Sequence, residues 1–504
     1  MGTQGAGEPR YRWLFGDQLG PHFLDDHQGE VVMIESKAVF KRRRFHRAKA
    51  HLMLSAMRHR AAELGDRVRY VRADTYREGL ERAVGDAPVS VCHPTSHAAL
   101  RLVTGSQQVT VEPPRGFLVP PADFAAWAGG TDRREQGHLR LEDFYRTVRR
   151  RHDLLMDGDQ PAGGRWNWDA DNRQPPPSAA NLPVPGPYLP REDDIDAEVR
   201  RDLDRWETDG EVTFVGHDAP RTFPASRREA LRALTRFVDK RLATFGRWED
   251  AMLAEDWAMS HSLLSAPLNL GLLDPAECTE RAEAAYRAGQ VPLNSAEGFI
   301  RQIAGWREYV WHLYWLFGKN YRHSNTLRHR RPLPDWFLDL DADAVQARCL
   351  STVLAQVRDR GWVHHIPRLM ILGNYALQRG WHPAEVTDWF HRNFVDGYDW
   401  VMLPNVIGMS QYADGGRMTT KPYVCGGAYI DKMSDLCHGC AYRPDQRVGD
   451  RGCPYAAGYW WFLDRHRSQL QHNARLAQPL RGLDRLTDLN EVVQQERHRA
   501  DRAP

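Results

Sequence analysis

The sequence predicts an α/β domain built on a doubly wound parallel sheet, followed by an all-α domain. Three features of the 504 residues support this prediction. Short apolar runs alternate with helical patterns in the first part, helical spacing dominates beyond residue 220, and a stretch rich in proline and glycine separates the two parts. We therefore expect domains at residues 1–130 and 220–504, joined by a long irregular connection over residues 131–219.

The first domain contains five apolar runs of strand length with helical patterns between them. We expect strands at residues 11–15, 31–35, 68–71, 89–92 and 108–111, and helices at residues 45–64, 76–84 and 97–103. Such alternation is typical of a parallel sheet, in which ligands bind at the carboxyl ends of the strands.

Polar residues and a glycine stand at two of those carboxyl ends. The first strand ends in Phe15, Gly16, Asp17 and Gln18, and Glu35 ends the second. No glycine-rich GxGxxG motif follows the first strand, so an ordinary dinucleotide site is not expected. The pattern leaves two interpretations open: a small bound ligand at this edge, or a purely structural sheet.

The predicted connection carries two tryptophans, Trp166 and Trp168, beside Gly163 and Gly164. Aromatic residues on a surface loop are typical of a binding surface. Packing against a neighbouring domain is the alternative interpretation.

Helix-start signals appear repeatedly beyond residue 220. Ser226 and Glu229 have the spacing of a capping box, and Asn294 with Glu297 predicts another helix start. Pro367 and Pro383 suit the first turns of two further helices. We expect no strand in this half of the chain.

The composition excludes several classes of protein. No apolar run suits a membrane span, residues 1–10 lack the apolar core of a signal peptide, and seven cysteines, an odd number, argue against a disulfide scaffold. We expect a cytoplasmic protein with reduced thiols. Because the net charge is only +2, nucleic-acid binding would need a local basic patch, and each candidate could equally be a solvated face. The candidates are residues 41–44, 149–151 and 328–331.

The cysteines near the C-terminus have the spacing of a metal site. Cys437 and Cys440 are separated by two residues, Cys453 precedes a proline, and Cys349 and Cys425 lie upstream. Spacing alone leaves three interpretations: an iron–sulfur cluster, a zinc site with four cysteine ligands, or unrelated buried thiols.

Several longer segments are similar to the photolyase and cryptochrome family. Residues 294–311 resemble its helix with a Trp-Arg-Glu triplet, residues 361–377 its His-x-x-x-Arg helix, and residues 396–399 its aspartate–glycine turn. The cysteines, residues 12–19 and the loop 163–173 resemble its iron–sulfur bacterial branch, also called prokaryotic (6-4) photolyases. The resemblance covers nearly the whole chain and favours iron–sulfur over zinc.

The resemblance implies three cofactors. An antenna chromophore, 6,7-dimethyl-8-ribityllumazine, would bind the first domain at Phe15, Gly16, Asp17, Gln18 and Glu35. A 4Fe-4S cluster would be held by Cys349, Cys437, Cys440 and Cys453, leaving Cys425 as a free thiol on the flavin side. FAD would bind in the helical domain at Thr244, Ser260, Ser262, Leu263, Ser265, Gln302, Arg307, Arg368, Asp396 and Asn405.

The activity that the resemblance implies is light-driven repair of (6-4) photoproducts in UV-damaged DNA by a monomer. His364 and His365 would supply the proton that this lesion needs, because the pKa of histidine lies near working pH. Trp389 and Tyr398 would relay electrons to the flavin. Trp166, Trp168 and Trp306 would contact DNA.

Each of these roles has a structural alternative. Adjacent histidines at a helix start can be packing residues, Arg368 and Asp396 can form a purely structural ion pair, and buried tryptophans need no redox role. Two other functions also remain open. One is a blue-light photoreceptor with little repair activity, and the other is a non-photochemical iron–sulfur protein that binds nucleic acid.

Overall fold

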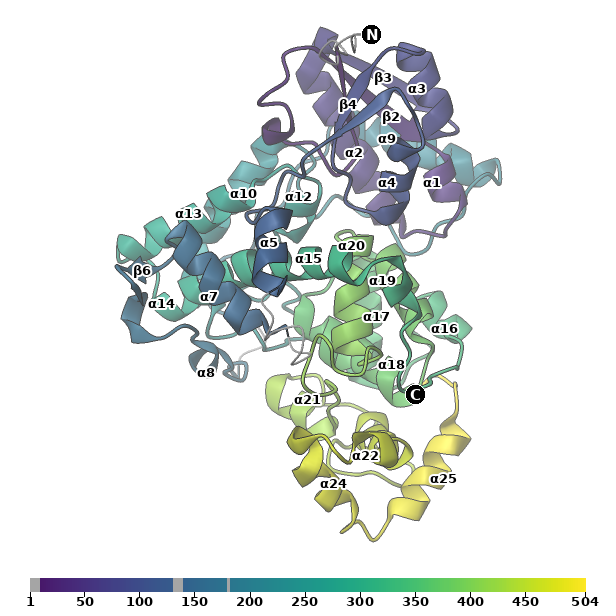
Figure 1. Cartoon of the computed structure of the whole chain (residues 1–504). Coiled ribbons are helices and arrows are strands. Elements are labelled where there is room, and N and C mark those ends of the chain that lie inside the picture. The colour runs from purple at the N-terminus through teal and green to yellow at the C-terminus, as the bar shows by residue number, and fades with distance from the viewer. Residues whose placement is uncertain (1–9, 130–138, 179–181) are drawn as a thin grey trace.

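The computed structural model describes residues 10–129, 139–178 and 182–504. Residues 1–9 and the predicted domain boundary at residues 130 and 131 lie outside the described residues. Figure 1 shows an α/β domain at one end, a helical region in the middle and a smaller group of helices, α21 to α25, at the other end.

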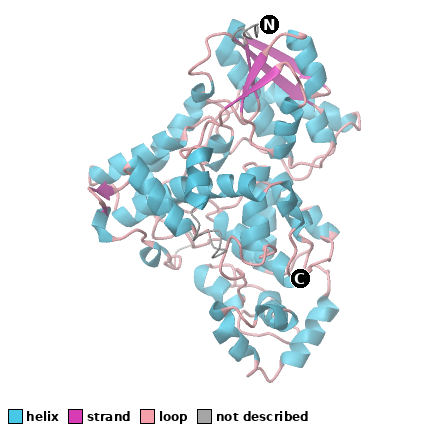
Figure 2. Ribbon diagram, viewed as in Figure 1, coloured by secondary structure: helices cyan, strands magenta, loops and turns pink. Residues whose placement is uncertain are grey.

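The N-terminal domain is built on a five-stranded parallel sheet, the magenta arrows of Figure 2. The strand order is β3-β2-β1-β4-β5, so the chain reverses its direction of winding between β1 and β4. The predicted doubly wound sheet is confirmed. The strands are β1 (Tyr11–Leu14), β2 (Glu30–Ser36), β3 (Val68–Ala73), β4 (Val89–Cys92) and β5 (Val109–Glu112).

The predicted helices of this domain are confirmed to within about two residues. They are α2 (Arg47–Leu64), α3 (Tyr76–Val84) and α4 (His97–Thr104), and a short α1 (Ala38–Lys41) was not predicted. Thr75 and Ser96 cap α3 and α4 by accepting hydrogen bonds from the backbone three residues ahead. The central strands β1 and β4 are buried along their whole length, as expected for strands covered on both faces.

The predicted connection holds more regular structure than its prolines suggest. It contains α7 (Leu141–His152), a small hairpin of β6 (Met156–Asp157) and β7 (Gln160–Pro161), α8 (Asp169–Asn172) and α9 (Asp194–Thr208). Helix α9 packs on α2 of the first domain, whereas α7 packs on the helical region. Tertiary packing on both sides therefore orders a segment whose composition predicted an irregular linker.

The rest of the chain is helical, and no strand lies within residues 220–504, all of which are described. This prediction is confirmed. Helix α5 (Pro121–Gly129) lies before this region. The helices beyond residue 220 are α10 (Arg227–Lys240), α11 (Leu242–Phe245), α12 (Ser265–Asn269), α13 (Pro275–Arg287), α14 (Leu293–Ile300), α15 (Glu308–Phe317), α16 (Asp335–Leu338), α17 (Arg348–Arg360), α18 (Asn374–Arg379), α19 (Pro383–Asn393), α20 (Asp399–Leu403), α21 (Gly427–Met433), α22 (Pro454–Arg465), α23 (Arg467–Leu470), α24 (Ala477–Leu483) and α25 (Leu489–Arg499).

Three π-helical segments interrupt these helices: η4 (Arg301–Arg307), η6 (Pro367–Gly373) and η7 (Pro404–Ser410). A π-helical turn inserts an extra residue per turn and is common at functional sites, because it redirects the side chains that follow. Pro367 lies at the start of η6 and Pro383 at the start of α19, as predicted.

Two of the predicted capping patterns need correction, although Ser226 does cap α10 as predicted. Ser226 accepts a hydrogen bond from the backbone N–H of Glu229, but the Glu229 carboxylate binds Arg221 and the N–H of Ala225, so only half of the capping box forms. Helix α14 begins at Leu293 after Pro292, and Asn294 is not its cap. Asn294 instead donates to Asn172 of α8, so both side chains have partners outside the capping pattern.

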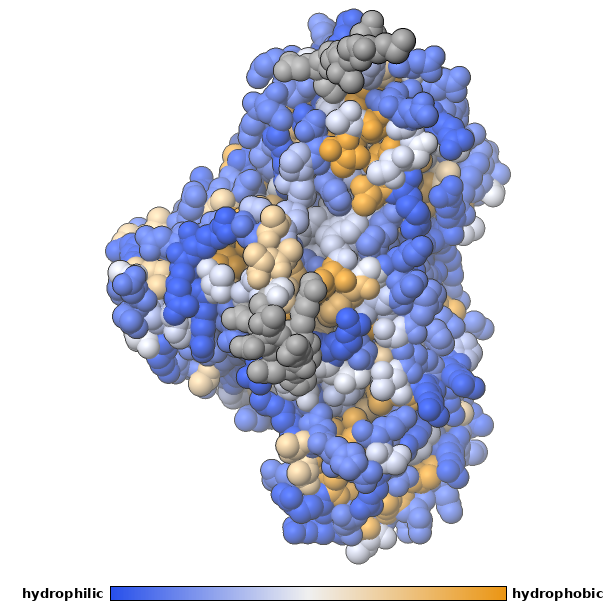
Figure 3. All heavy atoms as spheres, in the orientation of Figure 1, coloured by the Kyte–Doolittle hydropathy of each residue, from blue (hydrophilic) through white to orange (hydrophobic). Residues whose placement is uncertain are grey.

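No helix in the described part of the chain is long and apolar enough to cross a bilayer. Figure 3 shows a face dominated by hydrophilic side chains, with hydrophobic ones in small patches.

Candidate functional site

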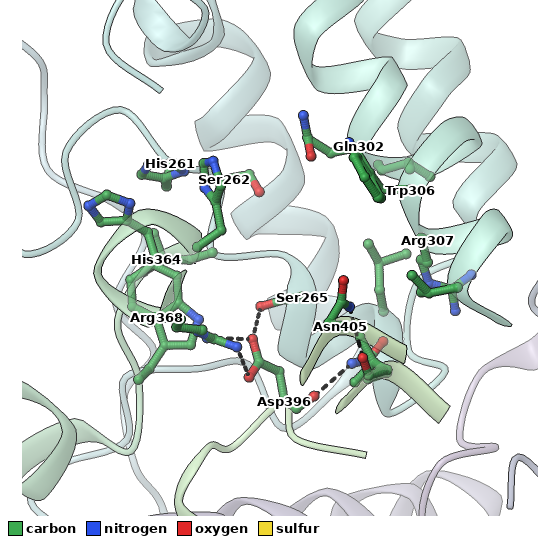
Figure 4. Close-up of a pocket in the computed structure, with 18 of the residues that line it drawn as sticks. His261, Ser262, Ser265, Gln302, Trp306, Arg307, His364, Arg368, Asp396 and Asn405 are labelled. Carbon is green, nitrogen blue, oxygen red and sulfur yellow. Dashed lines mark hydrogen bonds and ion pairs between the residues drawn. The ribbon is translucent and has the colours of Figure 1, made fainter. Parts of the chain in front are cut away.

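A cavity in the helical region brings together eleven of the predicted residues (Figure 4). They come from four segments that are distant in the sequence, and each π-helical segment contributes at least one of them. The predicted residues that line this cavity are Ser262, Leu263, Ser265, Gln302, Trp306, Arg307, His364, His365, Arg368, Asp396 and Asn405. Aromatic walls are supplied by Phe245, which the sequence placed beside Thr244 as a candidate for this site, and by Phe299, Trp362 and Trp400, which it did not single out as site residues.

Arg368 and Asp396 form a two-point ion pair on the cavity wall. Nη1 of Arg368 donates to Oδ1 of Asp396 and Nη2 donates to Oδ2, each at 2.9 Å. Ser265 donates to the same carboxylate at 2.6 Å, and Arg368 Nε donates to the carbonyl of Val363 at 2.7 Å. The Arg368 guanidinium also lies 4.2 Å from the centre of the Phe394 ring. These contacts hold the cation in one orientation, as bidentate pairing does in general.

Arg307 connects the cavity to the N-terminal part of the chain. Its Nη1 donates to the carbonyl of Gly116 at 2.8 Å, and the guanidinium lies 4.3 Å from the centre of the Phe117 ring. Burial lowers the pKa of Arg307 and raises that of the neighbouring Glu308 to about 7. The Nε atom of Arg307 is buried and has no hydrogen-bond partner among the described residues. A buried donor of this kind is costly unless a ligand satisfies it.

Gln302 and Trp306 stand on one side of the cavity, and His364 and Arg368 stand on the other (Figure 4). Gln302 donates to the carbonyl of Gly298 at 3.3 Å, and Asn405 donates to that of Val401 at 2.8 Å. In each amide the NH₂ group is therefore bound to its own helix.

Three histidines meet at one end of the cavity. The rings of His261 and His364 are stacked, with their centres 4.2 Å apart, and burial lowers the pKa of both well below the usual value. His365 differs because its side chain is 48% exposed, and its Nε2 lies 3.5 Å from Oδ1 of Asp250. Of the two predicted proton donors, only His365 therefore has both an anionic partner and access to solvent.

Sequence reasoning missed Asp250 and gave no separate role to His261. His261 stands inside the serine-rich stretch that was predicted to bind FAD, so its position offered a weak signal. Asp250 offered none, because it lies in an irregular segment far from His365 in the sequence.

Two predicted FAD residues do not line the cavity. Thr244 and Ser260 lie 3.2 Å apart, oxygen to oxygen, and Ser260 is almost fully buried. Ser262 accepts a hydrogen bond from the N–H of Leu264. The hydroxyl groups of this stretch thus have protein partners, and their contact with a phosphate stays a prediction.

The two tryptophans of the predicted connection lie outside the cavity. The guanidinium groups of Arg149 and Arg150 lie 5.3 Å and 4.7 Å from the centre of the Trp166 ring. Arg165 lies 3.5 Å from the centre of the Trp168 ring. Both rings therefore stand among cations, which suits a phosphate-bearing partner.

Trp389 reaches the cavity through one aromatic ring. It is fully buried, its ring centre lies 6.0 Å from that of Phe394, and Phe394 contacts Arg368. Tyr398 lies apart from it, with the Lys49 ammonium 5.5 Å from its ring centre.

The residues predicted to bind the antenna lie at the carboxyl edge of the sheet, and most have protein partners. Gln18 donates to the carbonyl of Cys92 at 2.9 Å. Glu35 accepts from Arg58 at 2.8 Å and from Tyr70 at 2.7 Å. Phe15 stacks on Trp13, and burial raises the pKa of Asp17, which accepts a hydrogen bond from Thr95. Gly16 lies between these residues.

Four cysteines converge on one small cavity near the C-terminal helices. Cys349, Cys437, Cys440 and Cys453 line it together with Pro444, Pro454 and Tyr455. Burial and the neighbouring thiols raise the pKa of Cys349 well above the usual value and that of Cys437 to about 12. A cluster of four thiols, in which burial raises the pKa of Cys349, Cys437 and Cys453, fits a metal centre with four sulfur ligands.

Cys425 lies outside both cavities. Its sulfur accepts a hydrogen bond from Asn374 at 3.1 Å and contacts the carbonyl of Met370. Cys425 is a free, buried thiol that packs on η6 and α18, so its place on the flavin side stays a prediction.

The fold and its main cavity define a two-domain cofactor-binding protein, with an α/β domain joined to a helical domain that holds the polar, aromatic-walled site. Comparisons with known proteins agree. The family described as deoxyribodipyrimidine photo-lyase-related protein matches residues 12–212. The chain is 41% identical over 490 residues to a protein of Agrobacterium fabrum named (6-4) photolyase, covering 92% of this chain and 94% of the relative.

Two solved structures share the fold over almost the whole length. A bacterial class III photolyase from Agrobacterium tumefaciens has a TM-score of 0.53 at 17% identity, covering 99% of this chain and 98% of its own. A Synechocystis cryptochrome has a TM-score of 0.55 at 13% identity, covering 98% of this chain and 100% of its own. The chain belongs to the photolyase and cryptochrome family, and this family implies FAD as the cofactor of the helical domain.

Proposed function

We propose that this protein is a DNA photolyase that repairs (6-4) pyrimidine photoproducts in UV-damaged DNA. The observation that carries the lesion specificity is the pair of His365, which lines the cavity, and Asp250 behind it. The relative named (6-4) photolyase, which matches over nearly the whole chain, supports the same proposal.

FAD fits the cavity by the chemistry of its walls. Three residues that line it have a buried nitrogen atom without a hydrogen-bond partner among the described residues. These atoms are Nε of Arg307, Nε2 of His261 and Nδ1 of His364. Arg368, Asp396, Gln302 and Asn405 would hold the flavin, and Ser262, Leu263 and Ser265 lie along the same wall. When bound and reduced, FAD supplies one electron to the lesion after it absorbs light.

A fixed cation on this wall has a clear electrostatic effect. Because Asp396 and Val363 hold the Arg368 guanidinium in place, it stabilises negative charge in the cavity without reorganising. Arg368 would therefore favour the anionic form of the reduced flavin, which is the form that must donate an electron.

Repair of a (6-4) lesion needs a proton transfer in addition to the electron transfer. His365 would donate from Nδ1, since Nε2 faces Asp250, to the oxygen or nitrogen group that must return to its original carbon. Asp250 stabilises the protonated ring, and although burial acts to raise the pKa of Asp250, the hydrogen bond from His365 lowers it. His364, whose neutral ring is stacked on His261, would position the neighbouring histidine and wall off water.

Further assignments follow from the same proposal. Cys349, Cys437, Cys440 and Cys453 would ligate a 4Fe-4S cluster, whose main role would be to join α17 to the C-terminal segment. Trp389, together with Tyr398, would carry electrons to the flavin, and Trp306 in the cavity would contact the lesion. Trp166 and Trp168 would contact DNA, and 6,7-dimethyl-8-ribityllumazine would be the antenna at Asp17 and its neighbours.

The test is a repair assay on anaerobically reduced protein with a defined (6-4) lesion in an oligonucleotide, in light and in darkness. We expect light-dependent repair by the wild type, and its loss in His365→Ala with FAD still bound. Repair retained by His365→Ala would remove the proton-donor role. No repair by wild-type protein that carries FAD and the cluster would favour the alternative, a blue-light photoreceptor.

A further inference from the structure

A second cavity, of about 350 Å³, lies in the C-terminal part of the molecule and shares no residue with the flavin cavity. It is lined by residues 327–331, the end of α18 and the end of α22 with the start of α23. Its lining contains five arginines and no aspartate or glutamate among the described residues. The arginines are Arg328, Arg330, Arg331, Arg379 and Arg465.

Arg379 is the most deeply placed of these cations. Its side chain is fully buried, and it forms an ion pair with Glu496 through Nη2 alone. Its Nε and Nη1 atoms have no hydrogen-bond partner among the described residues. Glu496 is also shared with Arg499, at 3.0 Å, so one carboxylate faces two guanidinium groups.

Arg331 and Arg465 stand around the same indole ring as Arg379. The three guanidinium groups lie 5.5 Å, 4.4 Å and 4.7 Å from the centre of Trp461. Arg465 donates to the carbonyl of Gln378 at 3.0 Å, and Arg331 has Asp501 at 3.5 Å. Burial, with the charges of Arg379 and Arg331, lowers the pKa of Arg465 to about 9.

The two histidines at this cavity carry no charge at neutral pH. His329 Nε2 and His466 Nε2 lie 2.9 Å apart, so one ring donates and the other accepts. Burial, assisted by nearby cations, lowers the pKa of His329 to about 2 and that of His466 to about 4. Both rings are therefore neutral, so the positive charge at this cavity comes from the arginines alone.

We propose that this cavity binds a small phosphorylated anion. Unpaired guanidinium nitrogens in a buried setting carry a large desolvation cost, which an anion with several oxygens offsets. Guanidinium forks match phosphate oxygens in geometry, and the Ser468 hydroxyl and the Gln469 amide offer further donors at the rim.

The half-buried placement of Arg331 and Arg465 favours a small anion over the backbone of DNA. The sequence suggested residues 328–331 as a DNA contact, but His329 is buried and Arg331 is half-buried. Only Arg328 and Arg330 are exposed. The phosphates of a duplex can reach those two side chains. Arg331 and Arg465 are half-buried and suit a small anion better, and Arg379 behind them adds positive charge without direct contact.

The test uses the full chain and inorganic pyrophosphate as the probe, with isothermal titration calorimetry as the readout. We expect saturable binding by the wild type and a Kd raised at least about tenfold in Arg465→Gln and in Arg331→Gln, since each removes one charge-assisted contact. Arg465→Lys keeps the charge and should lose less. Arg467→Gln is the matched control, because Arg467 is exposed, pairs with Asp484 and does not line the cavity.

Each variant is first checked for wild-type circular dichroism and bound FAD, and pyrophosphate should raise the Tm of the wild type but not that of Arg465→Gln. Absence of binding by the wild type at millimolar pyrophosphate would overturn the proposal. So would equal binding by all variants. A third arm measures affinity for undamaged duplex DNA. If Arg465→Gln weakens DNA binding while pyrophosphate does not bind, the phosphate belongs to DNA and the small-anion proposal fails.

Discussion

The imidazole of His365 lies 3.5 Å from the carboxylate of Asp250, measured from Nε2 to Oδ1. The pKa of Asp250 is lowered because the hydrogen bond to His365 and nearby cations outweigh burial, which acts to raise it. The carboxylate is therefore charged throughout the neutral range and can hold a protonated ring at the cavity wall. This pair, rather than the two adjacent histidines, is the arrangement suited to proton donation.

Asp250→Asn tests that arrangement. We expect (6-4) repair to fall by about 10- to 100-fold with FAD still bound, because the protonated ring of His365 loses its anionic partner. The measurement is the repair rate under continuous light across pH 6 to 9. Glu255→Gln, at an exposed site on the same segment, should repair like the wild type. A repair rate in Asp250→Asn equal to that of the wild type would contradict this role.

Asp396→Asn should weaken both folding and flavin binding. The Asp396 side chain is only 5% exposed, and removing one partner of a buried ion pair costs about 3 kcal/mol or more. Urea unfolding and the FAD absorbance of the purified protein measure the two effects. Asp388→Asn, at a carboxylate that is 30% exposed and pairs with Arg392, should change either quantity far less. Full FAD occupancy in Asp396→Asn would show that the pair is structural only.

Cys349→Ala and Cys425→Ala separate the proposed cluster ligand from the free thiol. We expect Cys349→Ala to lose iron and sulfide, because three thiolates remain where four are needed. Cys425→Ala should keep the full content, since Cys425 does not line that cavity. Iron and sulfide analysis with the visible absorption spectrum measures both. Iron lost equally from both variants would contradict the assignment.

Lys49 gives the folding free energy a distinct pH dependence. Burial lowers its pKa to about 7, against the pull of Asp396 and Asp399. Between pH 7 and about 10, the unfolded chain binds more protons at this site than the folded one, so the free energy of unfolding rises with pH by up to about 1 kcal/mol per unit.

The matched variant for that prediction is Lys49→Met. From pH 7 to pH 9, the wild type should gain stability relative to Lys49→Met in urea unfolding. Lys41→Met, at a more exposed lysine of the same domain, should run parallel to the wild type. A constant difference between the wild type and Lys49→Met would show that Lys49 keeps an ordinary pKa.

Trp389→Phe should slow the photoreduction of oxidised flavin. The indole is buried and connected to Arg368 through Phe394, so its removal leaves a gap in the aromatic route. The measurement is the rate of flavin bleaching under blue light with an external reductant. Trp206→Phe, in the cluster of Phe40 and Phe45 on the N-terminal domain, is the control. Unchanged photoreduction in Trp389→Phe would place the relay elsewhere.

The sequence by itself determined the sheet and the cysteine set. The strands are continuous apolar runs whose length and flanking residues are local properties, which is why β1 to β5 lie where the pattern predicted. The Cys-x-x-Cys spacing of Cys437 and Cys440 is equally local, and the family resemblance added Cys349. The same family resemblance paired Arg368 with Asp396 in advance.

Only the tertiary structure decided how these parts are used. It placed Asp250 against His365, packed Cys425 on Asn374, and drew Glu229 and Asn294 to partners that replaced their expected capping roles. It also gathered Arg331, Arg379 and Arg465 around Trp461. Most of these contacts join residues distant in the chain, and their energies depend on burial and on charges brought by other elements. A local pattern contains neither quantity, so it can name candidate residues but not their partners.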